Sequence, residues 1–251
     1  MRRLLSLLLL CLCLTGCIQY DVGITYDSQT HGELVQRIRL DGQIPAARRS
    51  TARAWLEGLE QQARNLGGKV RHPSKQESLI TIPFNNGKDL AAKFNRFFNP
   101  SQEERRQLWG SDLAELPAIG AQLTIRENNL LLVQRNRLTL DLDLRSLAVR
   151  GADGRLLVSP GGLLDIDFRL NTPWGLRRVD GTPAPELDDR RAFPKENRQL
   201  TWSLQPGELN HLEAVFWVPS PLGLGTVAIA AIVGIGTLIK ALLEGNGDGL
   251  G

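Results

Sequence analysis

The sequence contains only three cysteines, and all of them lie within its first seventeen residues. Cys11 and Cys13 belong to an apolar N-terminal run, and Cys17 follows that run. The rest of the chain therefore has no thiol, which excludes a disulfide framework, a thiolate nucleophile and a cysteine-ligated metal centre. Its stability must come from a hydrophobic core, which about two hundred residues can build.

Histidine is equally scarce, and the sequence lacks the common catalytic motifs. His31, His72 and His211 lie far apart, and none belongs to a His-Glu-x-x-His or comparable ligand spacing. A Gly-x-Ser-x-Gly elbow, a Ser-x-x-Lys pair, a Walker loop and a dinucleotide fingerprint are also absent. We therefore predict no metal site, no cofactor and no catalytic residues.

The chain also lacks a strong charge of either sign. Of its 30 Lys and Arg residues, Arg2 and Arg3 fall in the N-terminal run, and the others are nearly matched by 27 Asp and Glu. This balance gives no reason to expect nucleic acid as a partner. Arginine outnumbers lysine about four to one, and its guanidinium group suits lipid phosphates, although a GC-rich genome would explain the same bias.

The N-terminal run has the organisation of a secretory signal peptide. Arg2 and Arg3 form its charged region, and Leu4 to Leu14 form an apolar region that is shorter than the roughly twenty residues of a membrane span. Residues 14–17 (Leu-Thr-Gly-Cys) resemble a bacterial lipobox. The resemblance implies a diacylglyceryl group on the Cys17 sulfur, cleavage before Cys17 and a fatty acyl group, such as palmitate, on the freed amine. An ordinary cleaved signal peptide or an uncleaved anchor is the alternative.

The C-terminal region predicts a transmembrane helix. About eighteen residues from Leu222 to Ile239 carry no charge, and as a helix they would be roughly 27 Å long. Phe216 and Trp217 precede this run where an aromatic belt would lie, and Lys240 can reach the far interface. We predict these three residues as interfacial anchors, with a cytoplasmic C-terminus.

Small residues recur along the same predicted helix. Thr226, Ala230 and Gly234 lie four residues apart and would share one face, which could pack against another membrane helix. The alternative is that glycine and alanine are common in any membrane span. A membrane protein is therefore one expected partner, beside the membrane lipid that the acyl group and the helix would contact.

Between the two ends, the first part of the pattern predicts a ββαββα arrangement over residues 17–100. The helix that starts at Pro45 and ends at Gly67-Gly68 has a charged face, for which we predict exposure to solvent. That face comprises Arg48, Arg49, Arg53, Glu57, Glu60 and Arg64. A helical connection follows over residues 101–120, where an exposed Trp109 would mark a partner site.

From residue 121 the signal changes to strands. Alternating residues, with a turn at Asn128-Asn129, predict a β-meander of four or five strands over residues 121–219, and residues 171–197 are predicted as a loop. The fold class is therefore α+β, with antiparallel sheets, two or three helices, a β-meander and a C-terminal transmembrane helix. We divide the chain into a signal peptide (1–16), an extracytoplasmic domain (17–219), the transmembrane helix (220–243) and a short cytoplasmic tail (244–251).

Two carboxylate pairs lie on predicted strands. Asp141 with Asp143, and Asp165 with Asp167, would each point to one face and could bind a hard cation or perform acid–base chemistry. The apolar residues between them favour the simpler reading, in which each pair lies on the solvated side of a half-buried strand.

Several stretches of the sequence resemble a known family. Residues 16–24 (Gly-Cys-Ile-Gln-Tyr-Asp-Val-Gly-Ile), 32–36 (Gly-Glu-Leu-Val-Gln) and 82–87 (Ile-Pro-Phe-Asn-Asn-Gly) are similar to the cyanobacterial and plastid family called domain of unknown function 3153. That family is related to the LppM-type lipoproteins of mycobacteria, whose layout residues 201–204 (Thr-Trp-Ser-Leu) and the terminal span also resemble. The resemblance implies an α+β extracytoplasmic domain, lipid modification and a C-terminal anchor, but it assigns no catalytic residues.

These observations predict a membrane-anchored lipoprotein that is a non-enzymatic binding or assembly module at the outer face of the cytoplasmic or thylakoid membrane. Its domain would be periplasmic or lumenal, with both ends tied to the same membrane face. The alternative is a hydrolase or transferase that acts on lipid or envelope substrates through a pair such as Asp141 and Asp143. A concave pocket around these aspartates would favour the enzyme.

Overall fold

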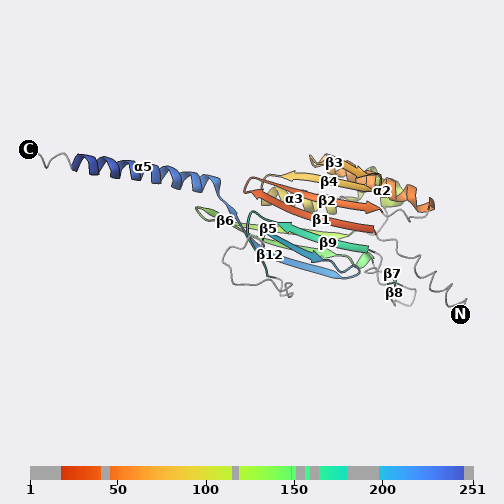
Figure 1. Cartoon of the computed structure of the whole chain (residues 1–251). Coiled ribbons are helices and arrows are strands. Elements are labelled where there is room, and N and C mark those ends of the chain that lie inside the picture. Colours follow the sequence, from red (N-terminus) through yellow and green to blue (C-terminus); the bar gives the residue numbers. More distant parts are fainter. Residues whose placement is uncertain are drawn as a thin grey trace, which may run out of the picture.

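The computed structural model describes residues 18–40, 46–114, 119–147, 149–150, 156–158, 164–179 and 198–245. Within them the chain forms a six-stranded sheet, a four-stranded sheet, a two-stranded ribbon and four helices, of which one projects from the body (Figure 1). In chain order the elements are β1 (Ile18–Ser28), β2 (His31–Leu40), α2 (Ala46–Asn65), β3 (Lys69–Ser74), β4 (Glu77–Phe84), α3 (Gly87–Phe98), α4 (Gln102–Ala114), β5 (Gly120–Asn129), β6 (Val133–Asp143), η1 (Arg145–Leu147), β7 (Val149–Arg150), β8 (Leu156–Val158), β9 (Leu164–Asn171), β10 (Trp174–Arg178), β11 (Gln199–Ser203), β12 (Leu209–Pro219) and α5 (Pro221–Gly245). The α+β class is confirmed.

The six-stranded sheet has the order β11-β9-β1-β2-β4-β3. Its neighbouring strands are antiparallel except β1 and β9, which run parallel. The first strand of the body thus lies inside the sheet, where Ile24 is opposite Leu34 on one side and Leu170 on the other.

Alternation along the strands separates a core face from a solvent face. Val22, Ile24 and Tyr26 are buried, as their period of two predicts, and β4 alternates in the same way along its whole length. The core face continues across the neighbouring strands through Leu34, Ile38, Ile80, Ile82, Phe84, Ile166, Phe168, Leu170 and Trp202.

The four-stranded sheet is antiparallel, with the order β10-β12-β6-β5. Its buried side contributes Leu138, Leu140, Phe216 and Val218 to the same core as the first sheet. Tyr26 of β1 joins the two sheets, because its ring centroid lies 4.8 Å from that of Phe216 and 5.0 Å from that of Phe84.

Helix α3 covers the first sheet and also protects the edge of the second. Asn86 caps its N-terminus by accepting a hydrogen bond from the Asp89 backbone, and Phe94 is among its buried residues. Asn95 both donates to and accepts from the backbone of Leu123 in β5, at 2.9 and 2.7 Å. β5 is the edge strand of its sheet, and unpaired backbone groups on an edge strand can pair with another chain and cause aggregation. The bonds from Asn95 occupy backbone groups on this edge.

The strand neighbours in the second half differ from the predicted meander. β9 and β11 join the six-stranded sheet, whereas β5, β6, β10 and β12 form the second sheet. Alternation shows that a segment is a strand, but it does not select the neighbours of that strand. The turn after β5 also differs, because Asn128 and Asn129 pair with Arg135 and Gln134, and the chain reverses at residues 130–132.

Candidate functional site

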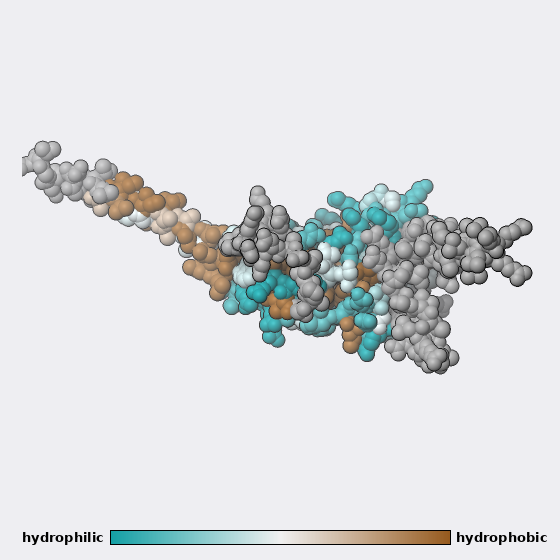
Figure 2. All heavy atoms as spheres, turned by 60° about the horizontal axis from the view of Figure 1, so that its bottom comes forward, coloured by the Kyte–Doolittle hydropathy of each residue, from teal (hydrophilic) through white to brown (hydrophobic). Residues whose placement is uncertain are grey.

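Helix α5 leaves the body instead of packing on it. Among the described residues it is the one helix that is long and apolar enough to cross a membrane, with a suitable window over Pro221–Ala241 of which only 6% is buried. The space-filling view shows this apolar surface as a brown rod beside a largely hydrophilic body (Figure 2). A helix that is apolar all round and unburied is typical of a membrane span.

A serine and a proline start this helix. The Ser220 hydroxyl accepts a hydrogen bond from the Gly223 backbone, which makes Ser220 an N-cap, and Pro221 occupies the first helical position, where it needs no partner. The Ser220 backbone N–H donates to the carbonyl of Leu132 at 2.9 Å. The beginning of α5 is therefore bonded directly to the turn between β5 and β6.

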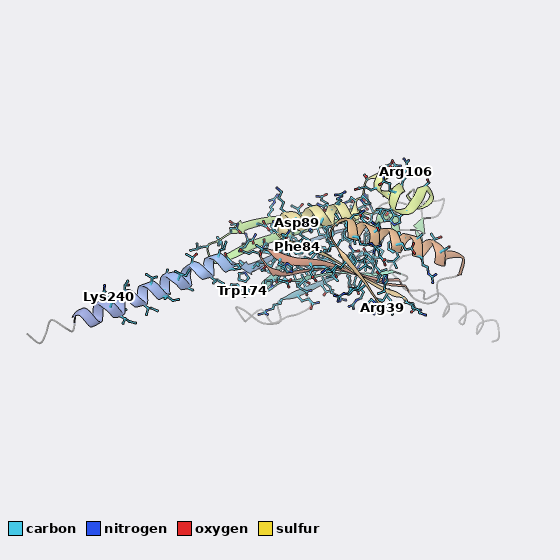
Figure 3. The ribbon with its side chains drawn as sticks, turned by 90° about the horizontal axis from the view of Figure 1, so that it is seen from above. Arg39, Phe84, Asp89, Arg106, Trp174 and Lys240 are labelled. Atoms are coloured by element: carbon cyan, nitrogen blue, oxygen red, sulfur yellow. The ribbon has the colours of Figure 1, made fainter. Side chains whose placement is uncertain are left out.

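Tryptophan side chains lie near the point where α5 leaves the body. Trp217 of β12 is opposite Trp174 of β10, and Trp174 is 39% exposed and lies close to the start of α5 (Figure 3). Phe216, by contrast, is fully buried against Tyr26. The predicted anchoring role of Phe216 is therefore wrong, because strand alternation points its ring into the core.

The predicted small-residue face lies along α5. Thr226, Ala230 and Gly234 are exposed and follow one another at intervals of four residues, and the Thr226 hydroxyl donates to its own helix at the carbonyl of Leu222. Lys240 lies near the far end of the helix (Figure 3). Packing of this face against another helix stays a prediction.

Cys17 lies outside the described residues, so its modification stays a prediction. The next residue, Ile18, begins β1, and β1 runs toward the end of the body from which α5 projects (Figure 1). Ile18 and the start of α5 therefore lie at opposite ends of the body, about 26 Å apart or more for the eight residue steps from Ile18 to Tyr26.

The carboxylate pair Asp141 and Asp143 lies on the outer face of β6. Asp141 contacts His211 of β12 at 2.6 Å, and both side chains are more than half exposed. Asp143 accepts two side-chain hydrogen bonds from Arg145, which lower the pKa of its carboxyl group to about 2. Asp143 is thus held in an ion pair with Arg145 on the surface of β6.

An open depression of about 860 Å³ adjoins this pair. Its lining comprises Asn95, Arg96, Asn99, Gly120, Ala121, Gln122, Asp141, Leu142, Asp143, Leu209, Asn210 and His211. In the part of the chain that the structure describes, no group of three His, Cys, Asp or Glu side chains could hold a metal ion. None of the described residues that line the depression is a serine, threonine or cysteine that could act as a nucleophile.

The second carboxylate pair is only partly described. Asp167 accepts a hydrogen bond from the Ser203 hydroxyl at 2.9 Å and lies 3.7 Å from Arg169, which also pairs with Asp21. The side chain of Asp165 is outside the described residues. Asp167 therefore belongs to an ion-pair group on the outer face of the first sheet.

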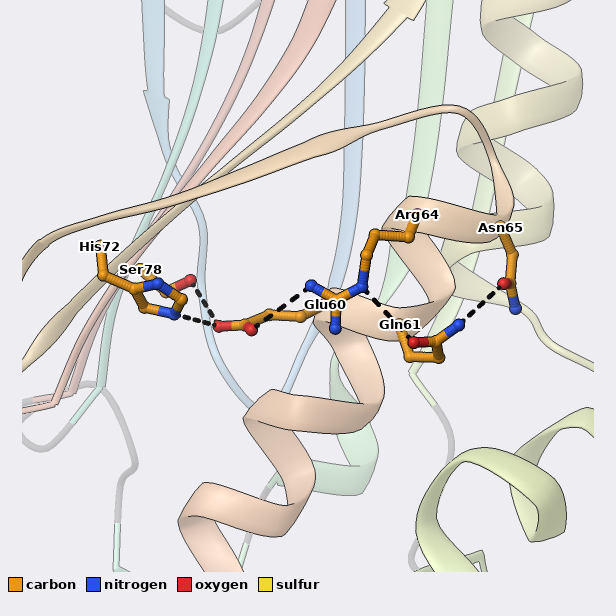
Figure 4. A network of polar contacts seen from close by, with 6 residues as sticks. All are labelled: Glu60, Gln61, Arg64, Asn65, His72 and Ser78. Atoms are coloured by element: carbon orange, nitrogen blue, oxygen red, sulfur yellow. Dashed lines mark hydrogen bonds and ion pairs between the residues drawn. The ribbon is translucent and has the colours of Figure 1, made fainter.

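A polar network around the buried Glu60 and Ser78, which periodicity did not reveal, fixes α2 to the β3–β4 hairpin. Glu60 is only 6% exposed, and its Oε1 accepts a hydrogen bond from the Ser78 hydroxyl at 2.9 Å and lies 2.8 Å from the His72 ring (Figure 4). Arg64 lies 3.8 Å from the other carboxylate oxygen. The prediction that Glu60 belongs to the solvated face is wrong, because its partners lie on distant strands. Ser78 and His72 meet the same carboxylate oxygen, which is not the arrangement of a catalytic triad.

Trp109 contacts helix α2. Its indole N–H donates to the carbonyl of Trp55 at 3.0 Å, and the ring occupies the space where a Cβ on Gly58 would lie, within 1.9 Å of the indole nitrogen. Trp109 is half-buried between α4 and α2. It joins the two helices, so it is not the exposed residue that would have marked a partner site.

Together these features define a two-sheet α+β body that carries a projecting apolar helix and an open depression. The sequence model of a family described as a protein of unknown function, DUF3153, matches residues 22–246, and the chain belongs to this family. Among solved structures, the chain is similar to the folded domain of the Mycobacterium tuberculosis LppM protein, with 11% identity and a TM-score of 0.38 over 81% of this chain and 91% of that domain. No curated protein matches the chain.

Proposed function

We propose that this protein is a membrane-anchored, non-enzymatic binding or assembly module whose body lies outside the cytoplasm. The observation that carries the proposal is α5, a long apolar helix whose side chains are almost entirely unburied by the rest of the chain. Only a bilayer or another protein can remove such a surface from water. Because α5 begins directly after the last strand, the body is held next to the membrane.

The acyl group proposed for Cys17 would be a second anchor. A spanning helix is effectively irreversible, so α5 alone is sufficient for attachment, and the diacylglyceryl and fatty acyl chains proposed for Cys17 would add to it. The lipid on Cys17 would then determine the orientation of the body or its contact with a further membrane.

The ion pair of Asp143 supports the non-enzymatic part of the proposal. Asp143 is paired with Arg145, which is an interaction that fixes a surface side chain. The small-residue face of α5 supports a membrane protein as the partner, and the depression supports a small ligand.

Two experiments test the proposal. The full chain is expected to stay with membranes after carbonate washing, and its release in full-length form would disprove the anchor. Affinity purification in mild detergent, compared with a chain that ends at residue 220, is expected to recover a membrane partner or lipid only with α5 present. Equal recovery by both chains would argue against a partner bound through α5.

The second candidate is a hydrolase or transferase, and the depression beside Asp141 and His211 is the observation that favours it. In that case Asp141→Asn would abolish turnover of a lipid or envelope substrate while leaving membrane attachment unchanged. Identical lipid and envelope composition in cells carrying the wild-type chain or Asp141→Asn would exclude this candidate.

A further inference from the structure

The turn between β5 and β6 is unusually apolar for its position. Residues 130–132 are three consecutive leucines, whereas hairpin turns are normally built from Gly, Asn, Asp, Pro or Ser. Leu130, Leu131 and Leu132 are 49%, 75% and 39% exposed. Single exposed apolar residues are common on protein surfaces, but three adjacent ones form a patch that requires an explanation.

Backbone contacts hold this turn against the first turn of α5. Leu130 and Val133 bond each other across the turn at 2.8 and 3.2 Å, and the Ser220 N–H donates to the Leu132 carbonyl. The approach is close enough that a Cβ on Gly223 would lie 1.7 Å from the Leu131 carbonyl oxygen, so only glycine fits there. The leucine turn and the start of α5 are therefore one unit.

The apolar surface of α5 is continuous with the leucine turn. Leu222 is 85% exposed and Leu224 is 42% exposed in the first turn of the helix, directly beside the leucines of the hairpin. In the space-filling view, the brown surface of the helix extends onto the end of the body (Figure 2). A bilayer that surrounds the start of α5 must therefore meet the leucine turn at the same depth.

We propose that the leucine turn, Leu130–Leu132, is inserted into the membrane interface where α5 enters the bilayer, and that the body is thereby held end-on. The proposal rests on the membrane span of the proposed function. Trp174 and Trp217 lie on neighbouring strands at this end of the second sheet, at the level where tryptophan favours lipid head groups. The occupant of this apolar surface is thus lipid.

The end-on arrangement places the other end of the second sheet away from the lipid. Val133 begins β6 beside the leucine turn, and Asp143 ends it about 33 Å away, for ten residue steps. Leu209 is opposite Asp143 and is 65% exposed, so it is an exposed leucine of the same sheet at the distant end. The chain thus contains a matched control for Leu131.

Fluorescence of single labelled cysteines in the full chain tests the proposal. Cys11, Cys13 and Cys17 are replaced by serine, and Leu131→Cys, Leu209→Cys or Ile232→Cys is labelled with a polarity-sensitive dye. Each protein is reconstituted into phosphatidylcholine and phosphatidylglycerol vesicles. All three positions are exposed, so the labels do not disturb the core.

The proposal predicts a blue-shifted emission at positions 131 and 232, quenched by nitroxide lipids, and a water-like emission at 209, quenched by iodide. Water-like emission at 131 with lipid-like emission at 232 would overturn the inserted turn while α5 stays in the membrane. Lipid-like emission at 209 would overturn the end-on orientation. Water-like emission at 232 would overturn both the inference and the proposed membrane span.

Discussion

Ile18 and Pro221, the first residues of β1 and α5, lie at opposite ends of the body. β1 runs from Ile18 toward Tyr26, and Tyr26 packs on Phe216 five residues before α5. Two anchors on one short chain would be expected to hold both ends to one surface. With the body end-on, however, Ile18 lies at the end of the body that is distant from the bilayer containing α5, and an acyl group on the preceding residue would be presented at that end.

This geometry predicts that the acylated protein connects two membranes. Proteoliposomes that hold the acylated chain through α5 should aggregate with protein-free vesicles, whereas the Cys17→Ser chain should not, because its distant end has no lipid. Light scattering and transfer between labelled vesicle populations measure the effect. Acceptor vesicles that stay free with both chains would show that the body lies along one bilayer.

The small-residue face of α5 gives a prediction with a control on the same helix. Gly234 and Gly236 both have open space where a Cβ would lie, but they are about 200° apart around the helix. Gly234→Leu should abolish recovery of a membrane partner, because a large side chain prevents close helix approach, whereas Gly236→Leu should preserve it. Equal recovery with both variants in detergent pull-downs would remove this face as an interface.

The Glu60 network gives a prediction about stability. Glu60→Ala leaves the buried Ser78 hydroxyl without its acceptor and should lower the free energy of unfolding by about 1–3 kcal/mol. Glu57→Ala, three residues earlier and exposed, should change it by less than about 0.5 kcal/mol. Urea unfolding followed by tryptophan fluorescence compares the two, and equal losses would contradict a structural role for Glu60.

Local patterns predicted the parts of the fold that depend on neighbouring residues. The ββαββα order predicted for residues 17–100 includes α3, which has a buried stripe of Leu90, Phe94 and Phe97 and an Asn86 cap, and the uncharged run predicted α5. The same patterns could not show that β9 pairs with β1, because alternation is identical for every neighbour in a sheet.

The sequence did not predict the positions of several residues at the candidate site, because these positions depend on tertiary contacts. The predicted turn at Asn128-Asn129 would place the leucines at residues 130–132 in a strand, whereas the bonds between Leu130 and Val133 and the contact with Ser220 show that they form a turn beside α5. Trp174 fell in a predicted loop, but it pairs with β12 at the sheet edge. Glu60 has partners 12 and 18 residues away, beyond the range of helical periodicity.

The two tyrosines of the chain give the last prediction, which concerns pH. Burial raises the pKa of Tyr20 and of Tyr26 well above the ordinary value of 10.0, and the negative charge of Glu127 adds to the effect at Tyr26. Because the folded pKa values exceed the unfolded ones, this stabilisation is complete below about pH 10. It should decrease at higher pH as the unfolded chain ionises first.

Near-ultraviolet titration measures this effect directly, because Tyr20 and Tyr26 are the only residues that form tyrosinate. The folded protein should show almost no tyrosinate at about pH 11, whereas the protein in guanidinium should titrate near the reference value of about 10. Tyr20→Phe and Tyr26→Phe assign any residual signal to one ring. A folded protein, verified by circular dichroism, that titrates like the denatured chain would show that these hydroxyls are accessible to water. It would then contradict the packing of Tyr26 between the two sheets, on which the connection between β1 and the base of α5 depends.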